Sequence, residues 1–234
     1  MSQQTRYITG TKQKSNNNTF VILSAGTGRR TKNYGNKSLI PYGNKRIIDH
    51  QVETIKLAYG ANTDIVLVTG YMSDKVIRDV QGLRLVENPF FDSTHIVESM
   101  RKGINACLES NLFFIHGDLI FSQSFIKPPS QDNICVPIDK NSRLDKTAVG
   151  VITDTEHVQN FSYGLPDKWS QIAFFPKSVF SYIKTKLNTA DNNMSSFEFM
   201  NELIKGRHKI TYYESPKGKI KEVHSMKDVI IRGI

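Results

Sequence analysis

Short apolar runs alternate with helical periodicities through the first half of the chain. The runs are brief, partly β-branched and bounded by polar residues, which is typical of buried strands; they cover residues 20–23, 64–69, 83–86 and 112–115. Between them, apolar residues recur at helical spacing over residues 45–59, 73–80 and 93–108. This alternation predicts an α/β fold with three α/β/α layers around a mostly parallel, Rossmann-like mixed sheet.

The second half has a different pattern, with more strands and fewer helices. Strand-like segments cover residues 134–138, 148–152, 158–163, 169–175, 209–213 and 220–224. Helical segments cover residues 176–187 and 195–205. We therefore expect one domain over residues 19–234, in which a mixed-sheet half from residue 139 packs on the first half. Residues 1–18 are polar and rich in Gln, Asn, Thr and Lys, which predicts a disordered lead-in.

Composition narrows the class of protein. No stretch approaches the roughly 20 apolar residues of a membrane-spanning helix, so we expect no membrane partner and a cytoplasmic location. Two cysteines, Cys107 and Cys135, form no disulfide framework or zinc spacing and predict reduced, buried thiols. The formal net charge of +9 attracts polyanions, but the basic residues are scattered. A nucleotide or a phosphorylated small molecule suits that charge as well as nucleic acid does.

A glycine turn follows the first apolar run. Residues 19–30 read Thr-Phe-Val-Ile-Leu-Ser-Ala-Gly-Thr-Gly-Arg-Arg. Glycines permit close approach of backbone N–H groups to phosphates, and the guanidinium groups of Arg29 and Arg30 are suited to phosphate oxygens. Thr31 stands where a Rossmann fingerprint needs its third glycine, and Thr31-Lys32-Asn33 does not complete a Walker A loop. On this pattern alone, an ordinary tight strand-to-helix turn explains the glycines equally well.

The predicted topology brings three polar turns to one place. Residues 24–28, 69–71 and 116–118 each follow a predicted strand of the parallel region. Ligands of open α/β sheets gather beyond the carboxyl ends of such strands. We therefore expect the glycine turn and Asp118 to share one edge of the sheet.

Longer motifs make the pattern more specific. Leu-Ser-Ala-Gly-Thr-Gly-Arg-Arg at 23–30 precedes Lys-Ser-Leu-Ile-Pro at 37–41, and further matching segments cover residues 68–71, 88–100 and 113–118. Together these segments resemble the nucleotidylyltransferases that act on sugar phosphates and phosphocholine, with the closest likeness to bacterial choline-phosphate cytidylyltransferases. The resemblance covers about residues 19–125 and implies a nucleotide-diphospho-sugar transferase (GT-A-like) fold. It also implies a nucleotide-binding half at 19–138 and an acceptor-binding half at 139–234.

The resemblance implies a reaction and roles for single residues. A nucleoside triphosphate, with CTP expected, and a phosphorylated acceptor would give an activated product and pyrophosphate. Arg30 and Lys37 would bind the triphosphate, and Asp118 would be catalytic as a ligand of Mg²⁺, with Mn²⁺ as an alternative ion. The nucleotide pocket would be lined by Leu23, Ser24, Ala25, Gly26, Thr27, Gly28, Arg29, Gly70, Tyr71 and Ser99.

Two features of the second half bear on the metal and the acceptor. The family's second metal-ligating Asp corresponds to His224, and imidazole suits Mn²⁺ or Zn²⁺ better than Mg²⁺. His224 either contributes a ligand, is replaced by another carboxylate, or marks weakened activity. Lys146, Trp169 and Glu198 are candidates for acceptor recognition, Trp169 by stacking on a sugar or facing a quaternary ammonium. A buried core tryptophan is the alternative for Trp169.

Two other functions fit parts of the sequence. A GT-A-type glycosyltransferase would share the sheet topology, but it needs an Asp-x-Asp metal motif and His116-Gly117-Asp118 lacks the first Asp. A catalytically degenerate relative could bind nucleotide or nucleic acid through its positive charge, and His224 at a metal position favours that hypothesis. The leading interpretation is the nucleotidylyltransferase, for which we expect no nucleic-acid partner.

Overall fold

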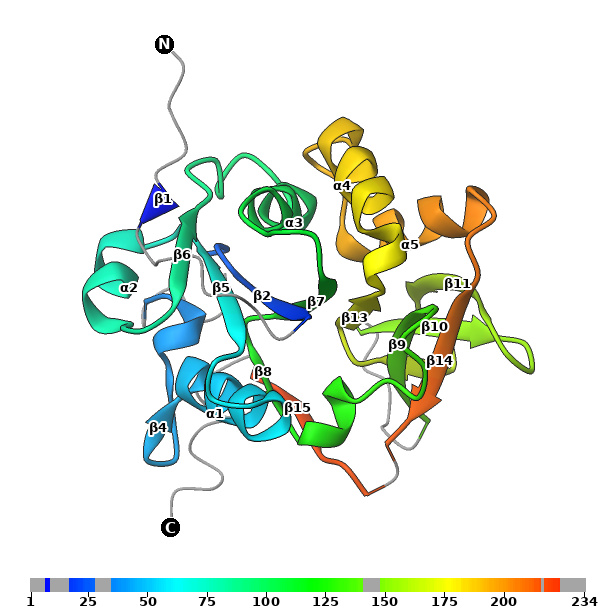
Figure 1. Ribbon diagram of the computed structural model, residues 1–234, viewed down its shortest axis with the longest axis horizontal. Helices are drawn as coiled ribbons and strands as arrows, with labels where there is room; N and C mark the ends of the chain where they lie inside the picture. Colours follow the sequence, from blue (N-terminus) through cyan, green and yellow to red (C-terminus); the bar gives the residue numbers. More distant parts are fainter. Residues whose placement is uncertain (1–6, 9–16, 28–34, 141–147, 216, 224–234) are drawn as a thin grey trace.

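An eleven-stranded mixed sheet runs through both halves of the chain (Figure 1). The computed structural model describes residues 7–8, 17–27, 35–140, 148–215 and 217–223. The strand order is β1-β6-β5-β2-β7-β13-β9-β12-β10-β11, and β14 pairs with β9 outside this path. Two small two-stranded sheets, β3–β4 and β8–β15, lie beside it.

The helices and strands have the following bounds. The strands of the first half are β1 (Tyr7–Ile8), β2 (Asn18–Ser24), β3 (Pro41–Tyr42), β4 (Lys45–Arg46), β5 (Asp64–Thr69), β6 (Arg84–Glu87), β7 (Asn111–His116) and β8 (Leu119–Phe121). Those of the second half are β9 (Ile134–Asp139), β10 (Val149–Thr153), β11 (Val158–Tyr163), β12 (Asp167–Trp169), β13 (Ile172–Phe175), β14 (Ile210–Glu214) and β15 (Ile220–Glu222). The α-helices are α1 (Ile47–Tyr59), α2 (Ser73–Asp79), α3 (Ile96–Asn105), α4 (Phe180–Thr189) and α5 (Ser196–Lys205), with 3-10 turns η2 (Lys37–Leu39), η3 (Gln123–Ile126) and η4 (Lys177–Val179).

Four parallel strands, in the order β6-β5-β2-β7, form the first half of the sheet. Leu23 of β2 lies opposite Val68 of β5 on one side and His116 of β7 on the other. The strands therefore end side by side, as the sequence predicted, and the segments that follow them meet at one edge of the sheet.

Helices cover both faces of the sheet, which confirms the predicted three layers (Figure 1). Alternation along β2 sends Val21 into the core under α3, α4 and α5, and Ile22 into the core under α1 and α2. The first helices form because apolar residues recur on one face, as at Ile48 and Ile55 of α1, both buried.

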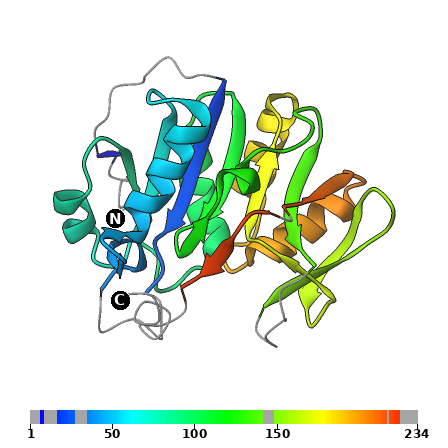
Figure 2. The same cartoon turned by 90° about the horizontal axis from the view of Figure 1, so that it is seen from below.

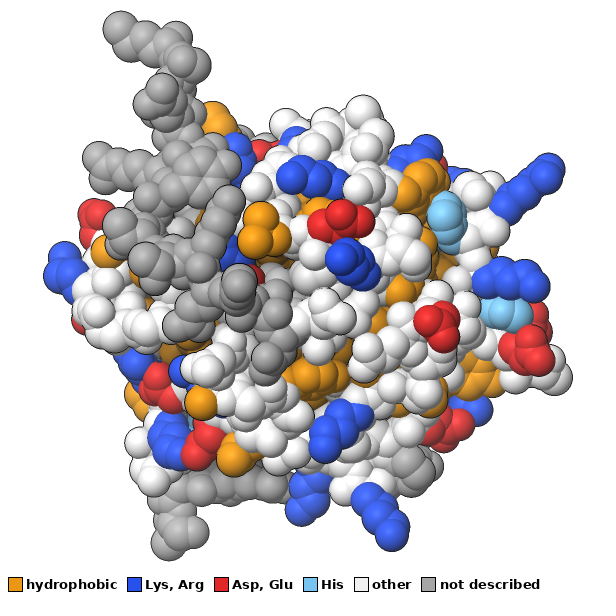
Figure 3. Space-filling model, in the orientation of Figure 1, with side chains coloured by type: hydrophobic (Ala, Val, Ile, Leu, Met, Phe, Trp, Pro, Cys, Tyr) orange, Lys and Arg blue, Asp and Glu red, His pale blue; other side chains and the backbone are white. Residues whose placement is uncertain are grey.

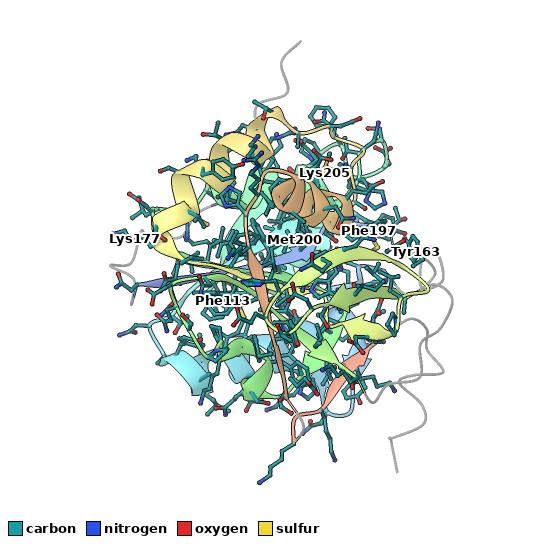
Figure 4. All side chains as sticks on the ribbon, turned by 90° about the vertical axis from the view of Figure 1, so that its right-hand side faces the viewer. Phe113, Tyr163, Lys177, Phe197, Met200 and Lys205 are labelled. Carbon is teal, nitrogen blue, oxygen red and sulfur yellow. The ribbon has the colours of Figure 1, made fainter. Side chains whose placement is uncertain are left out.

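The second half continues the sheet as a mixed one. β13 is antiparallel to β7, β14 is parallel to β9, and β10 and β11 form an antiparallel ribbon at the far edge. Helix α5 covers this part; its Met200 is buried, while Phe197 lies beside Tyr163 of β11 with ring centroids 5.2 Å apart (Figure 4).

Residues 169–175 are not one strand, as the apolar pattern predicted, but parts of two. β12 ends at Trp169 and β13 begins at Ile172, because Gln171 takes a left-handed conformation with φ of 56° and turns the chain. The peptide N–H of Ser170, in this turn, donates to the carbonyl of Pro137 in the neighbouring strand β9. A single positive φ leaves no trace in the spacing of apolar residues, so the sequence could not reveal the break.

Other boundaries also differ from the predictions. Tyr7–Ile8 forms β1 and pairs with β6, and β2 begins at Asn18, so the predicted disordered lead-in over residues 1–18 is wrong for these three residues. Helix α3 spans Ile96–Asn105 rather than 93–108, and α4 begins only at Phe180. Cys107 and Cys135 are both free and buried, as predicted. Among the described residues, no helix has the length and apolar character needed to cross a membrane.

A late strand returns to the edge of the sheet at which the parallel strands end. β15 pairs antiparallel with β8, which directly follows Asp118 (Figures 1 and 2). After β15, the peptide N–H of Val223 donates to the carbonyl of Asp118 at 2.8 Å. Asp118 is thus held by a segment that lies more than a hundred residues further along the chain.

Candidate active site

A cleft of about 240 Å³ lies where the parallel strands end. Its walls come from the β2 turn, η2, the segment before α3, and the turn after β7. The lining residues are Leu23, Ser24, Ala25, Gly26, Lys37, Asn88, Phe91, Thr94, His95, Ile96, Ser99, His116, Gly117 and Asp118. This position is where ligands of open α/β sheets bind.

Lys37 and Asp118 form an ion pair in this cleft. Their side chains meet at 2.6 Å, between Nζ and Oδ2, although 81 residues separate them in sequence. The Asp118 side chain is 12% exposed and that of Lys37 is 24% exposed, so the pair is largely shielded from water. The second carboxylate oxygen, Oδ1, is buried without a hydrogen-bond partner among the described residues. Two of the three residues predicted to be catalytic are therefore brought together.

The electrostatics keep Asp118 ionised. Burial raises the pKa of the carboxyl, but the Lys37 ammonium and the hydrogen bonds to the carboxylate together outweigh it, so the pKa lies below its ordinary value. Burial also lowers the pKa of His116 to about 4, against the opposing effect of the nearby Asp118 carboxylate. His116 is therefore neutral at neutral pH, and its Nε2 lies 3.2 Å from the hydroxyl of Ser196.

Asn36 ties the glycine turn to the turn that carries Lys37. Its amide nitrogen donates to the carbonyls of Ser24 and Tyr71, both at 2.9 Å. Its amide oxygen accepts from the hydroxyl of Ser24 at 3.0 Å, and from the peptide N–H and hydroxyl of Ser38 at 3.0 and 2.6 Å. Asn36 is fully buried and caps η2. In the sequence it was one polar residue of a polar loop, so nothing marked it as important.

Two glycines allow the strand ends to pack closely. A Cβ on Gly70 would lie 2.8 Å from the carbonyl oxygen of Ala25, and one on Gly117 would lie 2.7 Å from the Cβ of Ser24. The peptide N–H of Tyr71 donates to the same Ala25 carbonyl at 2.8 Å. Gly70 and Tyr71, predicted to line the nucleotide pocket, therefore lie behind its wall and support it.

The predicted nucleotide-binding residues otherwise divide into two groups. Leu23, Ser24, Ala25, Gly26 and Ser99 line the cleft, whereas Thr27 is described but does not. Ser99 is buried and its hydroxyl accepts from the amide of Asn88 at 3.1 Å. The lining residues that the sequence did not single out include Asn88, Phe91, Thr94, His95 and Gly117. Most of them belong to the 88–100 segment, whose resemblance to the family was the available signal.

Two predicted acceptor residues lie elsewhere. Trp169 is 2% exposed, its indole N–H donates to the carbonyl of Ile172, and its ring packs against Phe161. This burial contradicts a stacking role and supports the alternative of a core tryptophan. Glu198 is exposed and caps α5, where its carboxylate accepts from the peptide N–H and hydroxyl of Ser195 at 2.7 Å. Glu198 does not line the cleft.

The remaining site predictions lie outside the described residues: Gly28, Arg29, Arg30, Lys146 and His224.

Asp118 is the carboxylate available for a metal ion. The described part of the chain contains no group of three or more His, Cys, Asp or Glu side chains that could hold such an ion. Mg²⁺, however, is commonly bound by one or two carboxylates together with substrate phosphates and water. The unpartnered Oδ1 of Asp118 fits that kind of site.

Basic side chains of the described residues do not gather on the face shown in Figure 3. These Lys and Arg residues lie there singly or beside Asp and Glu, without a continuous basic tract. The cleft by contrast holds a cation and a carboxylate in one shielded place. This arrangement suits a small anionic ligand accompanied by a metal ion.

Comparisons with known proteins agree with this geometry. The family described as the MobA-like NTP transferase domain matches residues 20–198. A CTP:phosphoglutamine cytidylyltransferase of Campylobacter jejuni is 28% identical over an alignment of 136 positions that covers 52% of this chain and 52% of that protein. The chain thus spans about half the length of the curated relative it matches.

Solved structures share the fold. The inositol-1-phosphate CTP transferase from T. maritima superposes with a TM-score of 0.74 at 16% identity, covering 92% of both chains. The CTP:phosphocholine cytidylyltransferase from Streptococcus pneumoniae has a TM-score of 0.71 at 18% identity, covering 90% of this chain and 95% of that one. At these identities the likeness shows the fold, and it confirms the predicted nucleotide-diphospho-sugar transferase type.

Proposed function

Because this chain belongs to the MobA-like NTP transferase family, we propose that it is a nucleotidyltransferase acting on a phosphorylated small molecule. It would transfer the nucleoside monophosphate part of a nucleoside triphosphate to that acceptor and release pyrophosphate. One observation carries the proposal: Lys37 and Asp118, distant in sequence, meet in the cleft at the ends of the parallel strands.

The reaction joins two anions. An oxygen of the acceptor phosphate attacks the α-phosphorus, a new P–O bond forms, and the bond to the β-phosphate oxygen breaks. The pyrophosphate leaves with that electron pair. No covalent enzyme intermediate is needed, so the protein has to position both reactants and neutralise their charge.

Lys37 is suited to the leaving group. Its ammonium lies in the cleft and is held by a carboxylate rather than fixed in the core, so it can turn to a phosphate oxygen. Arg30, the second predicted cation, would act on the same triphosphate. The peptide groups of the β2 turn, held in place by Asn36 and Tyr71, would line the nucleoside side.

Asp118 would hold a divalent ion together with the phosphates, with Mg²⁺ expected and Mn²⁺ as the alternative. Such an ion neutralises charge that develops on the phosphate oxygens. His224 stays a candidate for a second ligand. The hydrogen bond from the peptide N–H of Val223 to the carbonyl of Asp118 supports that proposal, because Val223 directly precedes His224 in the sequence.

We propose CTP as the nucleotide. The support is the printed activity of the relatives: the Campylobacter jejuni protein and both solved structures named above are described as using CTP. Their acceptors differ, being phosphoglutamine, inositol 1-phosphate and phosphocholine. For this chain we therefore propose only a phosphorylated small molecule.

A pyrophosphate-release screen tests the proposal. The protein would be incubated with each of four nucleoside triphosphates, Mg²⁺ or Mn²⁺, and a panel of sugar phosphates, phosphocholine and related acceptors. We expect release with one nucleotide, CTP, and one acceptor class. Lys37→Ala and Asp118→Asn should each abolish it, whereas the matched controls Lys205→Ala and Asp132→Asn, at exposed positions, should keep it.

Other outcomes would point to other functions. No pyrophosphate with any metal, together with transfer or hydrolysis of a nucleotide-sugar, would replace the proposal by a glycosyltransferase. Nucleotide binding without any turnover would favour a catalytically degenerate relative. A salt-sensitive affinity for nucleic acid would contradict the proposed small-molecule substrates.

A further inference from the structure

The turn that carries Asp118 is held by backbone partners from several elements. The peptide N–H of Gly117 donates to the carbonyl of Leu23 at 2.9 Å, and the carbonyl of Asp118 accepts from Val223 at 2.8 Å. The peptide N–H of His116 donates to the carbonyl of Gln171 at 3.3 Å. These bonds leave the carbonyls on either side of the turn, at 116 and 119, to be satisfied by another group.

Gln51 of α1 satisfies both of them. Its amide nitrogen donates to the carbonyl of His116 and to that of Leu119, both at 2.9 Å. The side chain is 1% exposed, and it approaches the turn from the face of the sheet that α1 covers. One side chain thus holds the chain before and after Asp118.

Gln51 is a polar side chain at a buried position of α1 where apolar side chains do the packing. The other buried residues of α1 are isoleucines, at 47, 48 and 55. The amide oxygen of Gln51 is buried without a hydrogen-bond partner among the described residues. Burying the unpaired amide oxygen is unfavourable, and an apolar side chain would avoid that cost only by leaving the carbonyls of His116 and Leu119 unpaired. What only the amide supplies is the pair of donors to the Asp118 turn.

We propose that Gln51 is a positioning residue, which sets the Asp118 carboxylate relative to Lys37 and the bound triphosphate. Gln51 acts through the backbone of the Asp118 turn, since its side chain does not line the cleft in which the nucleotide and the metal ion would bind. The inference rests on the proposed function, because the position of Asp118 matters only if that carboxylate serves the reaction. It deepens that function by adding a residue from outside the site.

The test compares Gln51→Met with Ile48→Met in the full chain. Methionine has the length of glutamine but no donor, and Ile48 is buried on the same helix without a bond to the turn. Four experiments would be made on each variant. They measure hydrogen exchange of the amides in residues 113–121, Mn²⁺ affinity by electron paramagnetic resonance with CTP present, the kinetics of pyrophosphate release (kcat and KM), and the melting temperature.

We expect Gln51→Met to speed exchange in this segment and to weaken Mn²⁺ binding by about tenfold or more, as loss of outer-shell partners commonly does. The kcat should fall to a similar degree, while KM for CTP stays within about twofold. Ile48→Met should change the melting temperature without these effects. Gln51→Leu, which also lacks donors, should behave as Gln51→Met and replaces it if the methionine variant does not fold.

The experiments distinguish a failure of the positioning role from a failure of the proposed function. If the wild-type protein binds Mn²⁺ and CTP and turns over, but the Gln51 variants do the same with unchanged exchange, the positioning role is wrong and the proposed function stands. If Ile48→Met shows equal losses, the effect is general destabilisation and the positioning role is also wrong. If the wild-type protein neither binds nor turns over any metal-nucleotide, the proposed function fails and this inference fails with it.

Discussion

Asn36 connects the β2 turn with the turn that carries Lys37, and both line the cleft, so replacing it tests how the site is built. Asn36→Ala removes five hydrogen bonds that join it to described residues. The groups that lose a partner are the carbonyls of Ser24 and Tyr71, the hydroxyls of Ser24 and Ser38, and the peptide N–H of Ser38. Because Asn36 is fully buried, water does not readily replace the lost partners.

The structure allows the cost to be estimated. A hydrogen bond contributes about 1 kcal/mol net, and a buried group left unpaired costs about 1–3 kcal/mol. Hydroxyls can rotate toward other acceptors, whereas the two carbonyls cannot, so we expect a loss of about 3–5 kcal/mol in the free energy of unfolding. Domains are stable by about 5–15 kcal/mol, so the variant should remain folded at low temperature.

Urea denaturation at low temperature measures that loss, and calorimetry measures CTP binding to the folded variant. We expect at least about a tenfold weaker affinity for CTP, because Asn36 caps the turn that presents Lys37 and holds the β2 turn. Asn188→Ala is the matched control: Asn188 is exposed and pairs with Asn105, so its loss should stay within about 0.5 kcal/mol. A loss below about 1 kcal/mol for Asn36→Ala, with normal CTP affinity, would refute the reasoning.

Three further predictions concern single side chains. Lys37→Met should lower the rate of pyrophosphate release by about a hundredfold or more and the free energy of unfolding by about 2 kcal/mol, because it leaves the Asp118 carboxylate unpaired. Kinetics and urea denaturation measure the two effects, and a fully active variant would contradict the role assigned to Lys37. Trp169→Phe should cost about 1–3 kcal/mol of stability with an unchanged acceptor KM, whereas a raised KM in a fully stable variant would contradict its place in the core. Hydrogen bonds from Ser195 lower the pKa of Glu198, so Glu198→Gln should reduce the melting temperature above pH 4.5. The difference in melting temperature between variant and wild type should vanish as pH falls through the lowered pKa. A difference that does not depend on pH would contradict the role of the Glu198 carboxylate in capping α5.

Some predicted site residues lie in the cleft and others do not, because sequence patterns predict strand order better than they predict the direction of a side chain. The shared edge of the glycine turn and Asp118 follows from strand order, since parallel strands bring their following segments to one edge whatever the side-chain details. Lys37 was expected there because of the family motif, and the structure places it beside Asp118. Acceptor recognition depends on which way a side chain points, and spacing says little about that. Trp169 was a candidate for stacking on the acceptor, with a core position as the alternative, and its burial and its contacts with Ile172 and Phe161 place it in the core.

The sequence by itself determined the layered α/β architecture, the strand ends that form the cleft, and the edge of the sheet that the glycine turn shares with Asp118. These follow from local periodicity and from the short list of topologies that alternating strands and helices allow. Only the tertiary structure decided which polar residues hold the site. Asn36 and Gln51 look like ordinary polar positions in a loop and on a helix, and their importance arises because residues far along the chain place buried carbonyls against them. Such long-range hydrogen bonds leave no periodic signal, so folding has to bring the partners together before either residue acquires its role.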